Sequence, residues 1–173
     1  MTDNMPDLFR RLTEGVYVIG VAHDDRRNAF TASSVVHVSF RPLLLALSVN
    51  PEHASYPILA ASQVFAINVL RADQQSLAGH FGTQSCRTVD KLASIPWREG
   101  RTGAPVLLDA LAYFECEVIR EVEAGDHRLV IGRVVDGAVL APNAPPLLYA
   151  ATGNLDGSAE LYPKEFCEGQ QET

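Results

Sequence analysis

Regular alternation over one long segment is the feature that most limits the fold of this chain. Between Leu111 and Glu123, alternate positions are apolar or cysteine on one side (Phe114, Cys116, Val118 and Val122) and glutamate on the other (Glu115, Glu117, Glu121 and Glu123). A period of two residues is that of a β-strand with one face in the core and one in water. Gly125-Asp126 then signals a hairpin turn, and His127–Val135 predicts the returning strand. We therefore expect an antiparallel hairpin whose glutamates remain solvated.

Further short strands are predicted before and after this hairpin, at Val16–Ala22, Ala29–Phe40, Leu43–Val49, Val64–Leu70 and Leu147–Ala151. Short helices are predicted at Asp3–Thr13, Ala54–Ser62 and Ala72–Phe81, the last with Asp73 as a candidate N-cap. Polar residues with Gly and Pro predict a long loop over Thr83–Pro105. Because short turns join most of the strands, the pattern favours a mainly β, antiparallel barrel over a doubly wound α/β sheet.

Charge and hydropathy exclude two classes of partner. The 173 residues carry a formal net charge of −7, with no cluster of Lys and Arg. Nucleic acids and anionic membranes attract such clusters, so neither is expected as a partner. The longest apolar runs, such as Pro42–Leu47, are too short to span a bilayer, and the N-terminus has no signal-peptide core. We expect one cytoplasmic domain over residues 1–173, with its core at about 9–154 and a polar C-terminal tail.

The cysteines and the glycines exclude several common sites. Cys86, Cys116 and Cys167 have neither zinc-ligand nor disulfide spacing, so no metal is expected, and Cys116 is interpreted as a small core residue. No strand is followed by G-x-G-x-x-G or by a P-loop. Any nicotinamide or flavin must therefore be bound in another way.

Hydroxyl side chains gather in the segment N-A-F-T-A-S-S-V-V-H-V-S, which begins at Asn28. Thr31, Ser33 and Ser34 are short, they can donate and accept hydrogen bonds, and they let a ligand approach the backbone. These properties suit a phosphate or a ribityl chain. The alternative is a strand edge whose hydroxyls satisfy neighbouring backbone groups.

Two other strand ends carry polar residues. His127 follows the predicted turn beside Asp126, where it could bind a carboxamide or carry a proton; otherwise it is simply the first residue of a strand. Ser48–Asn50 ends a strongly apolar strand and is followed by His53 and Ser55. These residues could meet a ring with a donor–acceptor edge, or they could form an ordinary strand-to-helix connection.

In combination, these segments resemble the short-chain flavin reductases, the reductase components of two-component flavin monooxygenases. The resemblance covers about Phe9 to Asn154 and rests on seven landmarks in order: L-T-E-G-V-Y-V-I, N-A-F-T-A-S-S-V-V-H-V-S with R-P-L-L-L-A-L-S-V-N, F-A-I-N-V-L, L-A-G-H-F-G, F-E-C-E-V, G-D-H-R-L-V-I-G-R-V and P-L-L-Y. It implies the FMN-binding split-barrel fold, which is antiparallel and Greek-key-like with a few short helices, and a homodimer with flavin sites at the subunit interface.

The resemblance also implies roles for particular residues. It places the flavin phosphate and ribityl chain against Thr31, Ala32, Ser33 and Ser34, with Asn28 in the same landmark, and the isoalloxazine against Ser48, Val49 and Asn50, with Ser55 nearby. It places Phe81, Gly82 and Lys91 at the phosphate end, Lys91 as a counter-charge. His127 would lie near the nicotinamide as the catalytic-site residue, with Tyr149 close to the same pocket.

The activity implied is hydride transfer from NADH or NADPH to FMN or FAD, with the reduced flavin passed to a separate monooxygenase. Relatives often carry an aromatic residue and an arginine where this chain has Ala150–Asn154. That departure motivates an alternative, a flavoprotein that retains its FMN and acts directly on another substrate or carries electrons. A third possibility is a non-catalytic barrel that binds another planar ligand such as haem. The sequence does not distinguish FMN from FAD or NADH from NADPH.

Overall fold

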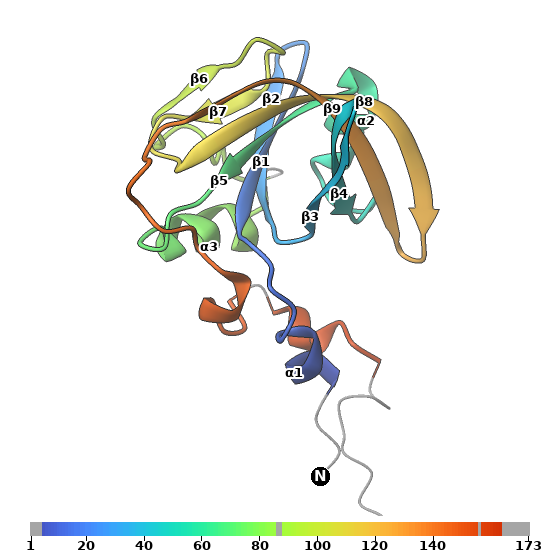
Figure 1. Ribbon diagram of the computed structural model, residues 1–173, viewed down its shortest axis with the longest axis vertical. Coiled ribbons are helices and arrows are strands. Elements are labelled where there is room, and N and C mark those ends of the chain that lie inside the picture. The colour runs from blue at the N-terminus through green and yellow to red at the C-terminus, as the bar shows by residue number, and fades with distance from the viewer. Residues whose placement is uncertain (1–4, 86–87, 156, 164–173) are drawn as a thin grey trace, which may run out of the picture.

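A seven-stranded antiparallel sheet, curved into an open barrel, forms the body of the protein (Figure 1). The computed structural model describes residues 5–85, 88–155 and 157–163. The helices are α1 (Met5–Phe9), α2 (Tyr56–Ser62) and α3 (Gln75–Thr83), with 3-10 turns η1 (Tyr149–Ala151) and η2 (Ser158–Glu160). The strands are β1 (Tyr17–His23), β2 (Arg26–Ala32), β3 (Val35–Phe40), β4 (Leu43–Val49), β5 (Val64–Val69), β6 (Trp97–Glu99), β7 (Pro105–Leu107), β8 (Ala112–Ala124) and β9 (His127–Val139). The prediction of a mainly β, antiparallel fold with few helices is confirmed.

The sheet order is β2-β1-β5-β8-β9-β4-β3, so its two edge strands are consecutive in the chain. The predicted single strand over Ala29–Phe40 is therefore wrong, because the chain crosses from one edge of the sheet to the other at Ser33–Ser34. Val35 N–H donates to the Ser33 carbonyl (2.9 Å), and Ser48 N–H donates to the Ser34 carbonyl (3.0 Å). These bonds turn the chain at the split between the sheet edges, and the predicted hydroxyl segment lies there.

Apolar side chains from the strands fill the barrel. Ile19, Phe30, Leu47, Phe65 and Ile67 are buried in one cluster, and each contributes about 1.5–3 kcal/mol by leaving water. Cys116 belongs to the same cluster, as predicted. Burial, and the neighbouring Glu115 carboxylate, raise the pKa of the Cys116 thiol to about 12. A buried, protonated thiol is consistent with a packing role.

The prediction that all glutamates of β8 face water is wrong at Glu115. A register shift between Glu115 and Cys116 places both residues in the interior, while Phe114 is partly exposed. The Glu115 carboxylate accepts hydrogen bonds from Arg101 N–H (3.0 Å), Thr102 N–H (2.8 Å) and Thr102 Oγ1–H (2.8 Å). These three donors replace water, so the charge is buried without an unsatisfied oxygen.

The predicted loop over Thr83–Pro105 contains structure that the sequence analysis missed. Strands β6 and β7 pair within and just beyond it, and β7 packs over β1 and β5. Asn68 fastens this hairpin: its Nδ2 donates to the carbonyls of Val18 (3.0 Å) and Pro105 (3.2 Å), and its Oδ1 accepts from Leu107 N–H (2.8 Å). Asn68 thus satisfies backbone groups of β1 and of the β6–β7 hairpin.

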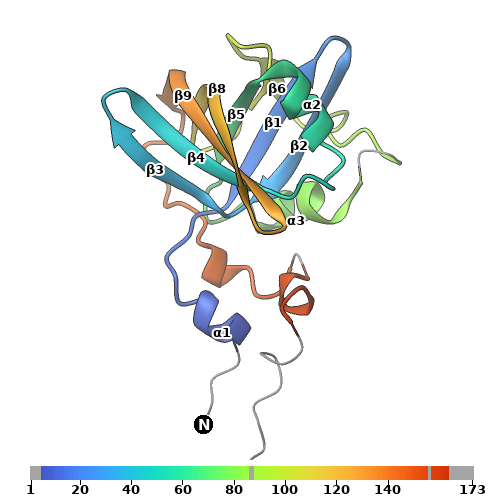
Figure 2. The ribbon, with the colours of Figure 1, turned by 90° about the vertical axis from the view of Figure 1, so that its right-hand side faces the viewer.

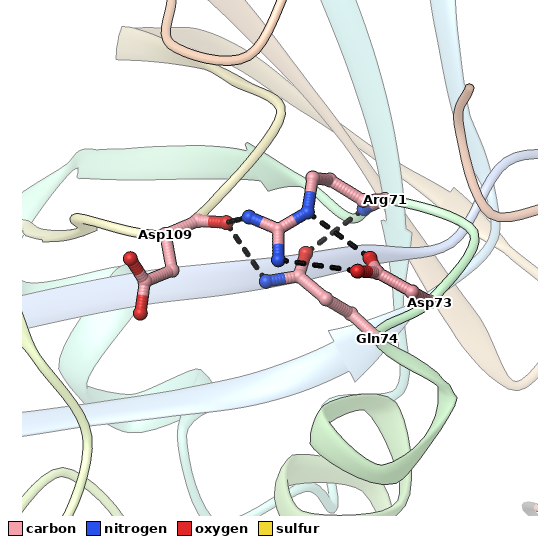
Figure 3. A network of polar contacts seen from close by, with 4 residues as sticks. All are labelled: Arg71, Asp73, Gln74 and Asp109. Atoms are coloured by element: carbon pink, nitrogen blue, oxygen red, sulfur yellow. Dashed lines mark hydrogen bonds and ion pairs between the residues drawn. The ribbon is translucent and has the colours of Figure 1, made fainter. Parts of the chain in front are cut away.

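Helix α3 begins at a polar cluster made by Arg71, Asp73, Gln74 and the Asp109 carbonyl (Figure 3). Asp73 is not the N-cap; Gln74 occupies that position, and Asp73 accepts from Arg71 Nε (3.0 Å), which lowers the pKa of the Asp73 carboxyl. Arg71 and Gln74 both donate to the Asp109 carbonyl, at 2.5 and 2.8 Å. The cluster ties the start of α3 to the chain after β7, and the helix runs past Gly82 to Thr83.

The segments near the two ends of the chain lie together beyond one end of the barrel (Figure 2). The rings of Phe9 and Tyr162 are 5.4 Å apart, and Arg10 donates to Asn154 Oδ1 (3.3 Å). The predicted strand at Leu147–Ala151 is wrong: Leu148 makes an isolated bridge to Gly15, and the 3-10 turn η1 follows. Residues 164–173 of the predicted tail, with Cys167, and Cys86 lie outside the described residues.

No helix among the described residues combines the length and hydrophobicity needed to cross a bilayer.

Candidate functional site

A groove of about 650 Å³ opens where the chain crosses between the sheet edges. Three strand segments wall it: the Phe30–Ser34 crossing, the Ser48–Asn50 end of β4, and the Asp126-His127 tip of the β8–β9 hairpin. The hairpin tip and the terminal segments lie at the same end of the barrel in Figure 1. The fold thus brings together the three polar segments that the sequence analysis singled out separately. The volume of the groove is typical of a pocket for a small-molecule ligand.

Three serine hydroxyls face this groove without a protein partner. Ser33, Ser34 and Ser48 line it, and none of their hydroxyls makes a hydrogen bond within the described part of the chain. Ser34 is exposed, and Ser33 and Ser48 are partly exposed, so these hydroxyls are accessible to a ligand. Thr31 differs, because its Oγ1–H donates to the Ala78 carbonyl of α3 (2.6 Å). The serines are available to a ligand, whereas Thr31 also holds α3 against β2.

His127 and Asp126 form a second polar group in the groove wall, at the start of the strand that pairs with β4. His127 Nδ1 lies 2.8 Å from Asp126 Oδ1, and this bond is the main reason that the pKa of the Asp126 carboxyl is lowered. Since a carboxylate accepts, Nδ1 carries the proton, and Nε2 of a neutral His127 is left as an acceptor. An acceptor there can bind the N–H₂ of a carboxamide.

The other groove residues supply apolar contact and further polar atoms. Val49 is buried at the groove floor, and Asn50 Oδ1 accepts from Glu52 N–H (2.9 Å), which leaves the Asn50 amide nitrogen to donate. The Tyr149 hydroxyl bonds the Ser158 hydroxyl (2.5 Å), and this bond connects η1 to η2. Ala32 lines the groove beside Ser33.

Four of the predicted cofactor residues lie behind the groove wall. Asn28 Nδ2 donates to the Ser55 hydroxyl (2.5 Å), and both residues are buried. Phe81 is a core residue of the cluster under α3. Lys91 is buried and its ammonium donates to the Phe81 carbonyl (3.0 Å), so it is not part of the groove wall. Any influence of Lys91 on a ligand in the groove would pass through the intervening protein.

Gly82 borders two smaller cavities that adjoin the groove. One, of about 250 Å³, lies between the crossing and α3; the other, of about 320 Å³, lies toward Gln84 and Ser85. A Cβ at Gly82 would approach Thr31 Cβ at 3.4 Å. Glycine here keeps the helix end close to the crossing strand.

Several groove residues were missed by the sequence analysis as site residues. His53 borders the groove and both smaller cavities. Residues of the terminal segments also line the groove: Phe9, Leu12, Glu14, Leu161, Tyr162 and Pro163. The sequence analysis named His53 after the Ser48–Asn50 strand end but gave it no role of its own. The terminal residues carry no local signal, since only the packing of both chain ends places them here.

The donor set fits a flavin better than a metal. Within the described ranges, no group of three or more His, Cys, Asp or Glu side chains could hold a metal ion. The open serine hydroxyls suit the oxygens of a ribityl phosphate, and the buried apolar surface of Phe30 and Val49 suits a planar ring.

Comparison with known proteins gives consistent matches. The family model described as "Flavin reductase like domain" matches residues 9–156. The reductase subunit HsaB of a flavin-dependent monooxygenase from Mycobacterium tuberculosis is 33% identical over 136 residues, covering 78% of this chain and 71% of that protein. The high molecular weight rubredoxin of Moorella thermoacetica is 38% identical over 141 residues, covering 80% of this chain and 61% of the relative.

Solved structures give the same result. The NADH:FAD oxidoreductase SgcE6 of Streptomyces globisporus superposes with a TM-score of 0.79 at 30% identity, covering 86% of this chain and 88% of that one.

Several curated relatives are longer proteins: the chain spans 61% of the rubredoxin and 25% of a diflavin flavoprotein from Synechocystis. The family match nonetheless covers most of the present sequence. The chain belongs to the flavin reductase-like family, as its sequence landmarks predicted.

Proposed function

We propose that this protein is an NAD(P)H-dependent flavin reductase that transfers hydride to FMN or FAD. The observation that carries the proposal is that three open serine hydroxyls and the Asp126-His127 pair line one groove. The first group suits the polar tail of a flavin and the second suits a nicotinamide carboxamide. The NADH:FAD oxidoreductase SgcE6 supports the assignment by similarity of fold and sequence.

The residues of the chain would bind and orient, while the flavin when bound supplies the hydride-accepting ring. Ser33 and Ser34 hydrogen-bond the ribityl phosphate, and Thr31 keeps the crossing against α3. Ser48 and the Asn50 amide meet the polar edge of the ring, while Val49 packs against it. His127, with its Nδ1–H held by Asp126, accepts from the carboxamide and orients the nicotinamide. Stacking the two rings and excluding water from between them are then the protein's main contributions.

A partner monooxygenase and a homodimer are part of the proposal. The relative HsaB is by name a reductase subunit of a flavin-dependent monooxygenase, which supports a similar partner here. Strand β3 is an edge strand with exposed apolar side chains: Val36 is 56%, Val38 49% and Phe40 82% exposed. An apolar edge of this kind is a surface that a second copy would cover. A cytoplasmic location remains a prediction from the sequence.

The test is NADH and NADPH oxidation by the purified protein at 340 nm, with FMN, FAD and no flavin compared. Saturable oxidation that depends on added flavin is expected. An anaerobic absorbance spectrum with FMN should bleach on addition of NADH. Flavin binding without NAD(P)H consumption would reject the reductase.

A second candidate is a protein that retains its flavin and carries electrons. The similarity to a high molecular weight rubredoxin favours it. So do Leu161, Tyr162 and Pro163, which border the groove and would restrict flavin exchange. This candidate predicts a yellow protein after gel filtration, whereas a reductase that uses flavin as a substrate would lose it.

A further inference from the structure

His53 lies where three cavities meet. It borders the main groove, the cavity between the crossing and α3, and the recess toward Gln84 and Ser85. Its ring packs on Phe30, with centroids 4.7 Å apart and planes tilted by 40°. A ligand that extends from the groove toward Gly82 would enter cavities that His53 borders.

Hydrogen bonding determines which ring nitrogen of His53 can bind a ligand. The backbone N–H of Ser55 donates to His53 Nδ1 (3.3 Å), so Nδ1 is an acceptor and the proton of the neutral ring is on Nε2. Nε2 has no hydrogen-bond partner within the described residues, and no buried side-chain nitrogen there is unsatisfied. Nε2–H is thus accessible, and the side chain that carries it borders all three cavities.

The groups packed around His53 favour the neutral ring. Burial lowers the pKa of the His53 imidazole, and the charge of Lys91 lowers it further. Phe30 offers an apolar face, and Glu52, beside His53 in the chain, is exposed. Near neutral pH the side chain is therefore an uncharged donor at Nε2.

We propose that His53 is a flavin-binding residue, which donates Nε2–H to an acceptor oxygen of the ribityl phosphate tail. This inference rests on the proposed function. The tail is favoured over the ring because the two smaller cavities place His53 next to Gly82 and Thr83, whereas Asp126 and His127 border only the main groove. His53 would thereby contact the ribityl phosphate tail, which flavin nucleotides have and a bare isoalloxazine ring lacks.

The test compares wild type, His53→Leu and His53→Gln in binding FMN, riboflavin and lumiflavin, followed by quenching of flavin fluorescence. Lumiflavin has the ring without the tail. His53→Leu removes the donor and should weaken FMN binding about tenfold, the usual effect of one lost hydrogen bond, while lumiflavin changes less than about twofold. His53→Gln keeps an N–H donor and should recover much of the FMN affinity. His23→Leu, at the β1–β2 turn, is the matched control and should bind as wild type does.

The outcomes separate the two proposals. A loss for FMN alone assigns the donor to a phosphate oxygen, and a loss for FMN and riboflavin together assigns it to a ribityl oxygen; both support the inference. An equal loss for lumiflavin, or unchanged FMN affinity in His53→Leu, overturns it and leaves the reductase proposal standing. Wild type that binds no flavin overturns both.

A measurement on the unaltered protein covers the case in which His53→Leu fails to fold. In ¹⁵N-labelled wild type, the His53 signals should report a neutral ring protonated at Nε2. Addition of FMN should shift Nε2, and lumiflavin should not. An Nδ1-protonated ring, or an FMN complex in which Nε2 does not shift, would overturn the inference.

Discussion

Thr102 donates two hydrogen bonds to one oxygen of Glu115: its N–H and its hydroxyl each lie 2.8 Å from Oε1. Arg101 N–H occupies the other oxygen, Oε2, at 3.0 Å. The carboxylate therefore folds the 100–102 turn onto β8 and sets the position of the β6–β7 hairpin. Gly100 is needed beside it, because a Cβ there would come within 2.2 Å of Glu115 Oε1.

Replacing Glu115 by Ala should destabilise the fold strongly. Three donors would lose their acceptor in a buried place, and an unsatisfied buried donor costs about 1–3 kcal/mol. We expect the free energy of unfolding in urea to fall by at least about 2 kcal/mol. Glu117→Ala is the control, since Glu117 is half-exposed and forms a surface ion pair with Arg133; it should cost under about 1 kcal/mol. Equal losses would contradict the structural role of Glu115.

Glu115 also shows what the sequence could not predict. Alternation identified β8 and its hairpin correctly, because a period of two is a local property of the strand. The register shift after Glu115 is set by the strands on either side and by the turn that satisfies the carboxylate, and neither is visible in the pattern. In the same way, Ala29–Phe40 is continuous in strand propensity, yet it is divided at Ser33–Ser34 because the closing of the sheet requires a crossing there.

The site residues also fall into those that the local sequence predicts and those that only the tertiary packing determines. Residues at the ends of strands, such as Ser33, Ser48 and His127, were predicted and are brought to one groove. Residues selected only by the resemblance to flavin reductases include Phe81 and Lys91, which the fold places behind the groove wall. Their burial depends on how α3 packs against residues 91–95, which the sequence does not specify locally. The terminal segments were not predicted to reach the groove because contacts between residues far apart in the sequence, such as Phe9 and Tyr162, place them there.

Removing the ammonium of Lys91 should lower stability and change the titration of His53. In Lys91→Met the Phe81 carbonyl loses its donor, at a cost of about 1–3 kcal/mol. Because the Lys91 charge helps lower the pKa of His53, that pKa should rise in the variant. Urea unfolding and NMR titration of the His53 ring measure the two effects. An unchanged His53 pKa would show that the charge of Lys91 does not reach the imidazole.

Filling the groove beside the Phe30–Ser34 crossing with a large side chain should prevent flavin binding without unfolding the barrel. Ser34 is at the groove and exposed, so Ser34→Trp places an indole in the space assigned to the flavin tail. We expect FMN affinity to fall beyond detection while circular dichroism and Tm remain close to those of wild type. Ser76→Trp, on the exposed side of α3, is the control and should bind FMN normally. Tight FMN binding by Ser34→Trp would place the flavin elsewhere.

His127→Ala should impair the use of NAD(P)H more than the binding of flavin. The variant loses the acceptor proposed for the carboxamide, and the groove serines are untouched. We expect KM for NADH to rise about tenfold and Kd for FMN to change less than about twofold. Asp126→Asn is the variant to compare with His127→Ala. The asparagine can still accept a hydrogen bond from His127 Nδ1, so a smaller increase in KM for NADH is expected. Equal losses of NADH and flavin affinity in His127→Ala would contradict its assigned position.

The pH dependence of stability should report His53. The pKa of His53 is lower in the folded protein than the ordinary 6.5. Below pH 6.5 the unfolded chain therefore binds a proton at His53 more readily than the folded protein does. The free energy of unfolding should therefore fall as the pH is lowered from about 7 toward the folded pKa of His53. In His53→Gln this part of the slope should be missing, while the slope from the carboxylates remains. Urea unfolding of both proteins between pH 5 and pH 8 gives the difference directly. Parallel curves over that range would mean that His53 titrates alike in the folded and unfolded states, and that its imidazole is not held neutral.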